Sequence, residues 1–157
     1  MGGRQGSDLQ ADPRPLEAGW MGVGKRLKRV IYDTSMLMLL YEGVPVFEES
    51  ASLLLSNPEC VVPRQVLEEL ERIASGPGPI HRRRAARLAI EALRRESCRV
   101  VDTSAESADE AILALALSDQ EAIVATADNE LRRRLREKGL PNIYYRRSRH
   151  GLMLEGD

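Results

Sequence analysis

The sequence predicts an α/β fold in which a parallel β-sheet is flanked by helices. Short apolar runs rich in Val and Ile recur along the chain, and a helical pattern of apolar residues follows most of them. Strands that alternate with helices form parallel sheets covered by helices. The strand at residues 28–33 ends on Asp33, and a helix begins directly after it. In open α/β sheets ligands bind beyond the carboxyl ends of the strands, so acids at these ends are the first functional candidates.

Length and composition fit a single domain. The chain has 157 residues, of which 43% are hydrophobic, and a net charge of -1. That charge argues against nucleic-acid binding through global charge, although a local basic patch can still bind. No apolar run reaches the ~18 residues of a membrane helix and no signal-peptide core is present, so we expect a cytoplasmic protein without a membrane partner. Residues 1–24 predict a flexible N-terminal tail, and residues 25–157 predict the folded domain, which closes with a basic C-terminal tail.

Five strands and six helices are expected after the tail. The strands are short and mostly apolar, at residues 28–33, 60–62, 98–102, 122–126 and 142–145. The helices are expected at residues 34–41, 45–56, 63–74, 80–96, 107–118 and 129–138. Turn signals separate these elements, notably Asn57-Pro58, the Gly-Pro loop at 75–79 and Gly139 after the last helix.

One acid of the helix at 63–74 lies on its apolar face. Glu69 shares that face with Val66 and Ile73, whereas Glu68 belongs to a polar stripe. An acid among apolar residues costs free energy unless it is paired or liganded. We therefore expect Glu69 to face a functional site and Glu68 to be exposed. The alternative is a structural Glu69 that an Arg neutralises.

Two further acids occupy helix starts. Asp109 lies on the apolar face of the helix at 107–118, whereas Glu110 points outward, and Asp128 follows the fourth strand. Each has a structural alternative, because an acid in the first turn stabilises the helix dipole and an N-cap Asp binds free backbone N–H groups. Asp102 also follows a strand and is a spare candidate.

Acids gathered at one edge of a sheet repel one another, and a divalent cation relieves that repulsion. Oxygen ligands suit Mg²⁺ or Mn²⁺, and two such ions can act together on a phosphate ester. We expect one or two of these ions to be held by four catalytic acids, Asp33, Glu69, Asp109 and Asp128. The sequence has no Cys or His cluster with zinc spacing, no Gly-rich phosphate loop and no nucleophile elbow.

Four short motifs, taken in order, resemble those of the PIN-domain nucleases. They are Tyr32-Asp33-Thr34-Ser35, Pro63 with Val66-Leu67-Glu68-Glu69-Leu70, Ala108-Asp109-Glu110-Ala111-Ile112, and Thr126-Ala127-Asp128 with Leu131. The resemblance runs from about Arg29 to Tyr145, and the end of the chain looks like the archaeal branch related to ribosomal-RNA-processing PIN proteins. It implies a three-layer α/β/α sandwich with five parallel strands in the order 3-2-1-4-5.

The resemblance also implies Mg²⁺- or Mn²⁺-dependent cleavage of RNA by the four acids. Support roles near the site would fall to three hydroxyl residues, Thr34, Ser35 and Thr126. Many family members dimerise, so a homodimer is possible. The leading hypothesis is an endoribonuclease in rRNA or other RNA maturation. The alternatives are the toxin of a toxin–antitoxin pair, with an antitoxin as partner, and a nucleic-acid-binding PIN module with little catalysis.

Three arginine clusters are candidate phosphate contacts. We expect RNA binding by two of them, which contribute Arg132, Arg133, Arg136, Arg146 and Arg147. The cluster of Arg82, Arg83, Arg84 and Arg87 is a further candidate. The alternative for each cluster is a solvated helix face.

The two cysteines have no metal-ligand spacing. We expect Cys60 and Cys98 to be buried free thiols. The strand order implied by the PIN resemblance would make their strands neighbours, so a disulfide is the alternative.

Overall fold

The computed structural model describes residues 27–156, and the tail expected at 1–24 lies outside them. The strands are β1 (Arg29–Tyr32), β2 (Glu59–Pro63), β3 (Arg99–Val101), β4 (Ala122–Thr126), β5 (Asn142–Arg146) and β6 (Gly151–Glu155). The α-helices are α1 (Thr34–Leu37), α2 (Val46–Leu54), α3 (Arg64–Ser75), α4 (Ile80–Arg95), α5 (Ala108–Leu117) and α6 (Asn129–Glu137). Two short 3₁₀ helices complete the described chain, η4 (Met38–Glu42) and η5 (Arg147–Arg149). No helix in this range is both long and apolar enough to cross a bilayer.

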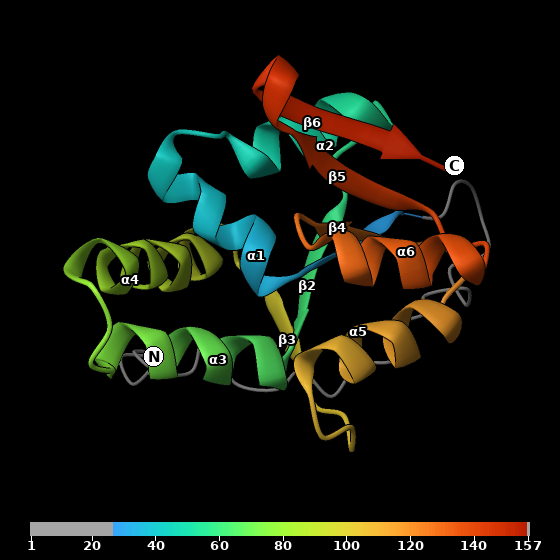
Figure 1. Ribbon diagram of the computed structural model, residues 1–157. Coiled ribbons are helices and arrows are strands. Elements are labelled where there is room, and N and C mark those ends of the chain that lie inside the picture. The colour runs from blue at the N-terminus through green and yellow to red at the C-terminus, as the bar shows by residue number, and fades with distance from the viewer. Residues whose placement is uncertain (1–26, 157) are drawn as a thin grey trace, which may run out of the picture.

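The sheet confirms the expected strand order. Its order is β3-β2-β1-β4-β5-β6, and the first five strands are parallel. Every residue of the central strands β1 and β4 is buried, because a parallel sheet is covered on both faces. Figure 1 shows α1, α3 and α4 on one side of the strands and α5 and α6 on the other.

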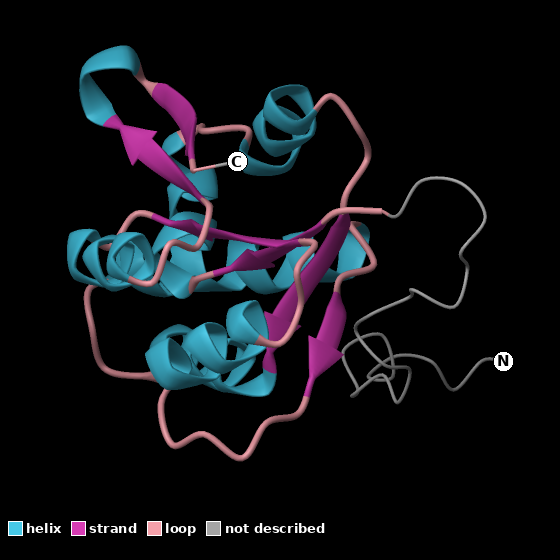
Figure 2. Cartoon of the chain, turned by 90° about the vertical axis from the view of Figure 1, so that its right-hand side faces the viewer, coloured by secondary structure: helices cyan, strands magenta, loops and turns pink. Residues whose placement is uncertain are grey.

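The C-terminal segment is not the simple basic tail that was expected. It returns as a sixth strand, β6, which pairs antiparallel with β5 and places Leu152 opposite Tyr145. The turn uses η5 and His150, whose φ is 49°. The β5–β6 hairpin extends beyond the rest of the sheet (Figure 2). The expectation of a basic tail came from the arginines before His150, and the short apolar run after them, which forms β6, was not assigned as a strand.

The expectation of two free thiols is wrong. Cys60 and Cys98 form a disulfide with a Cα–Cα distance of 4.7 Å. The cause is the register of neighbouring parallel strands, which places Val61 beside Arg99 and therefore brings the two preceding residues together. The bridge joins the starts of β2 and β3.

The parallel strands bring their carboxyl ends to one edge, where the predicted acids lie. Tyr32 is paired with Ala125 in the register of β1 and β4. Asp33 therefore follows β1 at nearly the same level at which Thr126 ends β4. Three helices, α3, α5 and α6, begin near this edge (Figure 1), so their first turns can contribute side chains to it.

Candidate active site

Asp33 is buried at the junction of β1 and α1, and three donors hold its carboxylate. Oδ1 accepts a hydrogen bond from the backbone N–H of Thr34 at 2.8 Å. Oδ2 accepts from the hydroxyls of Ser35 and Thr126, each at 2.8 Å. The residue is only 4% exposed. These bonds fix the orientation of the carboxylate and favour its charged form.

Burial nevertheless raises the pKa of Asp33 above its ordinary value. The hydrogen bonds from Ser35 and Thr126 lower the pKa, and the negative charge of Asp109 raises it further. The charged form is therefore held in an unfavourable environment. Perturbed acids of this kind concentrate at functional sites.

Glu69 reaches the same edge from α3. Its Oε1 accepts a hydrogen bond from the Thr34 hydroxyl at 2.7 Å, which ties α3 to the start of α1. Glu69 is half-buried and Glu68 is exposed, which confirms the distinction drawn from helical periodicity. Within residues 27–156 Glu69 makes no ion pair, so the Arg-neutralised alternative does not describe it.

Asp109 and Asp128 come from the starts of α5 and α6. Asp109 accepts no hydrogen bond within the described chain. Asp128 is the N-cap of α6, and its Oδ1 accepts from the backbone N–H groups of Glu130 at 2.8 Å and Leu131 at 3.2 Å. The capping alternative is therefore correct for Asp128, but it uses one of the two carboxylate oxygens. Glu110 is exposed, as expected.

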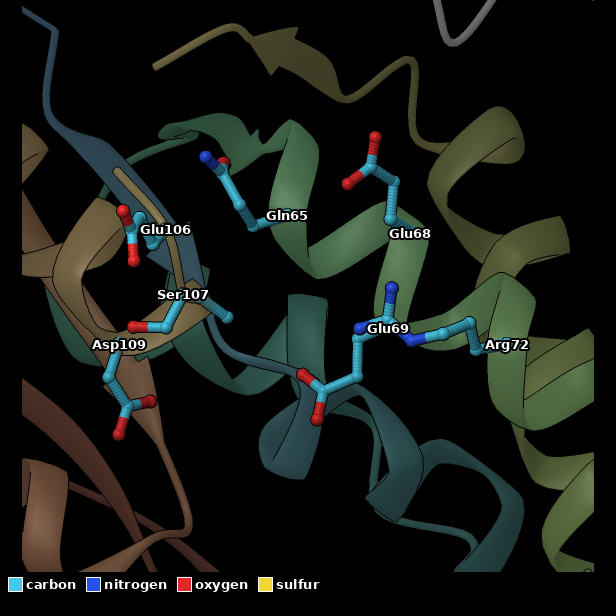
Figure 3. Close-up of a pocket in the computed structure, with 8 residues that line it drawn as sticks. Gln65, Glu68, Glu69, Arg72, Glu106, Ser107 and Asp109 are labelled. Carbon is cyan, nitrogen blue, oxygen red and sulfur yellow. The ribbon is translucent and has the colours of Figure 1, made fainter. Parts of the chain in front are cut away.

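The four acids are linked by electrostatic repulsion. Burial raises the pKa of Asp109, and the charges of Asp128 and Glu69 raise it further, against an opposing effect of Arg134. Asp109 in turn raises the pKa of Asp33. Glu69 and Asp109 line a cavity of about 350 Å³, and Figure 3 shows them directed toward the same space from α3 and α5. Asp33 and Asp128 lie beside this cavity rather than in its wall.

Two hydroxyl groups connect the junctions that carry Asp33 and Asp128. Ser35 Oγ accepts from the backbone N–H of Ala127 at 2.9 Å, and Thr126 Oγ1 accepts from that of Asp128 at 3.0 Å. Both hydroxyls donate to Asp33. The β1–α1 and β4–α6 junctions are therefore held at a fixed distance from each other.

The chemistry of the donor set fits a hard divalent cation. Asp109 and one oxygen of Asp128 have no hydrogen-bond donor in the described part of the chain, and burial together with the charges of Asp128 and Glu69 raises the pKa of Asp109. In residues 27–156, however, no three or more His, Cys, Asp or Glu side chains are arranged to hold an ion. The residue types fit Mg²⁺ or Mn²⁺, while the metal site itself stays a prediction.

Gln65 is a site residue that the sequence analysis missed. Its Nε2 donates to the carbonyl oxygens of Thr103 at 3.3 Å and Ala105 at 2.7 Å, and to the Thr103 hydroxyl at 2.9 Å. These bonds hold the loop before α5 against α3 and so position Asp109. Nothing in the local pattern could reveal this, because the partners lie 38 and 40 residues away.

Asp102, the spare candidate, lies outside the cluster. It follows the edge strand β3, its side chain is 64% exposed, and it accepts from Arg64 Nε at 2.8 Å. A solvated ion pair of this kind is a surface feature. Asp102 is therefore not a member of the site.

The arginines of α6 are paired with acids. Arg132 Nε lies 3.0 Å from Oε1 of Glu155 in β6, and Arg136 Nε lies 3.7 Å from Oε2 of the same residue. Arg132 also stacks on the ring of Tyr144. Arg133 pairs with Glu130 and Glu137 on its own helix. Arg134 was not among the expected RNA contacts, but it is the arginine of α6 that lies near Asp109. It pairs with Glu110 at 2.9 Å and lowers the pKa of Asp109.

The arginines of the hairpin are exposed. Arg146 and Arg147 lie at the carboxyl end of β5, and Arg147 stacks over the ring of Tyr145. Neither has an acidic partner in the described chain. RNA contact by Arg132, Arg133, Arg136, Arg146 and Arg147 stays a prediction.

Comparison with known proteins agrees with the fold. The family model described as PIN like domain matches residues 30–148, a span that contains all four acids. This chain belongs to the PIN-like domain family. The PIN domain is similar to Ribonuclease VapC4 of Methanocaldococcus jannaschii, with 29% identity over 124 residues, which cover 78% of this chain and 93% of the relative.

A solved PIN domain has the same fold. The structure of the PIN domain endonuclease Utp24 superposes with a TM-score of 0.66 at 23% sequence identity. The match covers 82% of this chain and 92% of the other. At this identity the likeness shows the fold alone, and it agrees with the parallel sheet described above.

The raised pKa values predict how the stability of the metal-free protein depends on pH. A carboxyl whose folded pKa exceeds its unfolded value of 3.8 stabilises the fold below that value, and the contribution is lost as pH rises through the folded pKa. Asp109→Asn should therefore raise the melting temperature in EDTA near pH 7, and the gain should shrink as pH falls toward 4. Glu68→Gln, which removes an exposed carboxylate of the same cavity, should follow the wild type. An Asp109→Asn effect independent of pH would contradict this account.

Proposed function

We propose that this PIN domain is a divalent-metal-dependent endoribonuclease that hydrolyses RNA phosphodiester bonds, with a role in rRNA or other RNA maturation. The observation that supports the proposal is the electrostatic coupling of acids from separate parts of the chain, since Asp109 raises the pKa of Asp33, and Asp128 and Glu69 raise that of Asp109. Acids that repel one another are suited to a cation that also binds phosphate. The similarity to Ribonuclease VapC4 supports RNA as the substrate.

The four acids would hold the ion, and their neighbours would fix them in place. When bound, Mg²⁺ or Mn²⁺ lowers the pKa of water and neutralises charge on the phosphate. Ser35 and Thr126 orient Asp33, and Thr34 orients Glu69. Asp109 keeps oxygens free of hydrogen bonds, so it is placed to accept a proton from the attacking water. The positive charge of the neighbouring Arg134 attracts an approaching phosphate and offsets part of its repulsion by the acids.

Neighbouring glutamates of α3 provide a matched test of catalysis. Glu69→Gln should lower the rate of RNA cleavage by about 100-fold or more, the usual effect of removing one group that stabilises transition-state charge. Glu68→Gln removes the same charge one position away and should cleave like the wild type. Labelled single-stranded and hairpin RNAs are incubated with Mn²⁺, Mg²⁺ or EDTA, and the products are resolved on a denaturing gel.

Three results would oppose the proposal. Cleavage that persists in EDTA would contradict metal dependence, because the acids alone cannot neutralise the phosphate. Equal loss in Glu68→Gln and Glu69→Gln would show a general charge effect on α3 rather than a catalytic role for Glu69. Binding of RNA without cleavage under any metal would favour the nucleic-acid-binding module instead.

A growth assay separates RNA maturation from the toxin role that the PIN resemblance raised. A toxin would arrest growth when expressed, and Asp33→Asn would relieve the arrest. It would also copurify with a small antitoxin encoded beside it. Normal growth of cells that express active wild-type protein would favour maturation.

A further inference from the structure

Three arginines of α3 and α4, Arg72, Arg83 and Arg87, differ from those of α6 in their partners. Every arginine of α6 is paired with a glutamate. On the other side of the acid cluster, Arg72 makes no ion pair or hydrogen bond within residues 27–156. Arg83 and Arg87 donate only to neutral backbone carbonyls, those of Gly78 at 3.1 Å and Ala74 at 3.3 Å. The charge of these three side chains is therefore not neutralised.

The three unneutralised arginines form a path that begins in the cavity. Arg72 and Glu69, which precedes it by one turn of α3, both line the cavity, and Figure 3 shows their side chains at this cavity. The bond of Arg87 to Ala74 places the next cation at the last turn of α3, about 8 Å along the helix from Glu69. The bond of Arg83 to Gly78 places the third over the loop that leads to α4.

Few acids oppose this charge. Glu68 and Glu71 are exposed on α3, and the one acid within α4, Glu91, lies near Arg94 at the far end of that helix. Arg82 and Arg84, also exposed and without acidic partners in the described chain, add to the same half of α4. The surface beyond the cavity is therefore cationic, whereas the cavity is acidic.

We propose that single-stranded RNA leaves the acid cluster along α3 and crosses onto α4, with successive phosphates bound by Arg72, Arg87 and Arg83. This rests on the proposed function, since it takes the acids as the place of cleavage. A phosphate backbone is a row of negative charges that demands unneutralised cations along its length. The arginine fork suits phosphate oxygens. The paired arginines of α6 would have to break ion pairs before they bind phosphate, whereas Arg72, Arg83 and Arg87 would not.

Binding measured without cleavage tests the path. The affinity of the full chain for a 5′-fluorescein-labelled single-stranded RNA is measured by anisotropy in EDTA over a range of salt concentrations. Arg72→Ala/Arg83→Ala/Arg87→Ala should weaken binding by about tenfold and lower the salt slope by about two units, since each phosphate contact in a single strand contributes roughly 0.7. Arg94→Ala/Arg95→Ala removes two charges of the same helix at the end that leads to β3, away from the acids, and should bind like the wild type.

A charge-preserving variant separates binding from folding. Arg83 and Arg87 also bind carbonyls near the end of α3, so their loss could loosen the helix. Arg83→Lys/Arg87→Lys keeps the charge, and it should keep most of the salt slope while the alanine variant loses it. An unchanged slope in the alanine variant, or an equal loss in Arg94→Ala/Arg95→Ala, would overturn the path.

The outcome for the path is distinct from that for the nuclease. If the wild type cleaves RNA and the triple alanine variant binds RNA normally, the proposed path is wrong and the proposed nuclease function is retained. Binding that depends on these arginines, without cleavage under any metal, would retain the path and reject the nuclease. If polyglutamate binds as tightly as RNA and loses the same affinity in the triple variant, the surface receives an acidic protein and the RNA assignment is wrong.

Discussion

Asp33→Asn should abolish RNA cleavage and leave the metal-free melting temperature unchanged or raised. The substitution removes one charge from the repelling cluster and keeps the side-chain shape. The buried site can accept it, because the amide oxygen can still accept from Thr34 N–H. The amide nitrogen can donate to Ser35 or Thr126, whose hydroxyls lie 3.3 Å apart and can bond to each other. Removal of a charge held in an unfavourable environment offsets any loss in these bonds.

Metal should then stabilise the two proteins unequally. A ligand that binds the folded state at 100 times its Kd adds about 2.7 kcal/mol, which is a rise of roughly 5–10 °C in the melting temperature of a chain of this size. Mn²⁺ should produce such a rise in the wild type and a smaller one in Asp33→Asn. Thermal melts of both proteins in EDTA and in Mn²⁺ make the comparison. If Asp33→Asn melts well below the wild type in EDTA and Mn²⁺ shifts both equally, Asp33 is a structural acid.

Loss of the Cys60–Cys98 disulfide should lower the melting temperature by about 10 °C without loss of cleavage at 25 °C. The bridge closes a loop with a sequence separation of 38. A loop of this length restrains the unfolded chain by about 4 kcal/mol, and each kcal/mol shifts the melting temperature by roughly 2–4 °C. Activity should survive because the bridge joins the starts of β2 and β3, at the edge of the sheet opposite the acids.

Reduction provides the control for this prediction. A reductant should lower the melting temperature of the wild type and leave that of Cys60→Ala/Cys98→Ala unchanged. Thiol titration of the unfolded, non-reduced wild type should find neither cysteine free. Two titratable thiols, or equal melting temperatures for wild type and variant, would show that the bridge does not stabilise this protein.

Local sequence patterns were sufficient to distinguish inward-facing acids from exposed acids next to them in the sequence. Helical periodicity distinguished the half-buried Glu69 from exposed Glu68, and it distinguished Asp109 from exposed Glu110. The change from an apolar strand to a helix marked Asp33. These inferences succeed because the period of a helix and the polarity of its faces are properties of a few consecutive residues. The order of the strands came from the PIN resemblance, not from periodicity.

The sequence alone thus determined which acids lie at strand ends and on inward helix faces, together with the α/β class. Tertiary structure alone decided which distant residues meet. The register of β2 and β3 made the disulfide, and pairing with β5 turned the expected basic tail into β6. Packing of distant segments gave Gln65 its loop partners and assigned Asp102 to the surface. It also placed Glu155 beside Arg132 while leaving Arg72 unpaired. The physical reason is that such contacts join residues tens of positions apart, and their geometry depends on strand register and helix packing, which no local pattern of residues encodes.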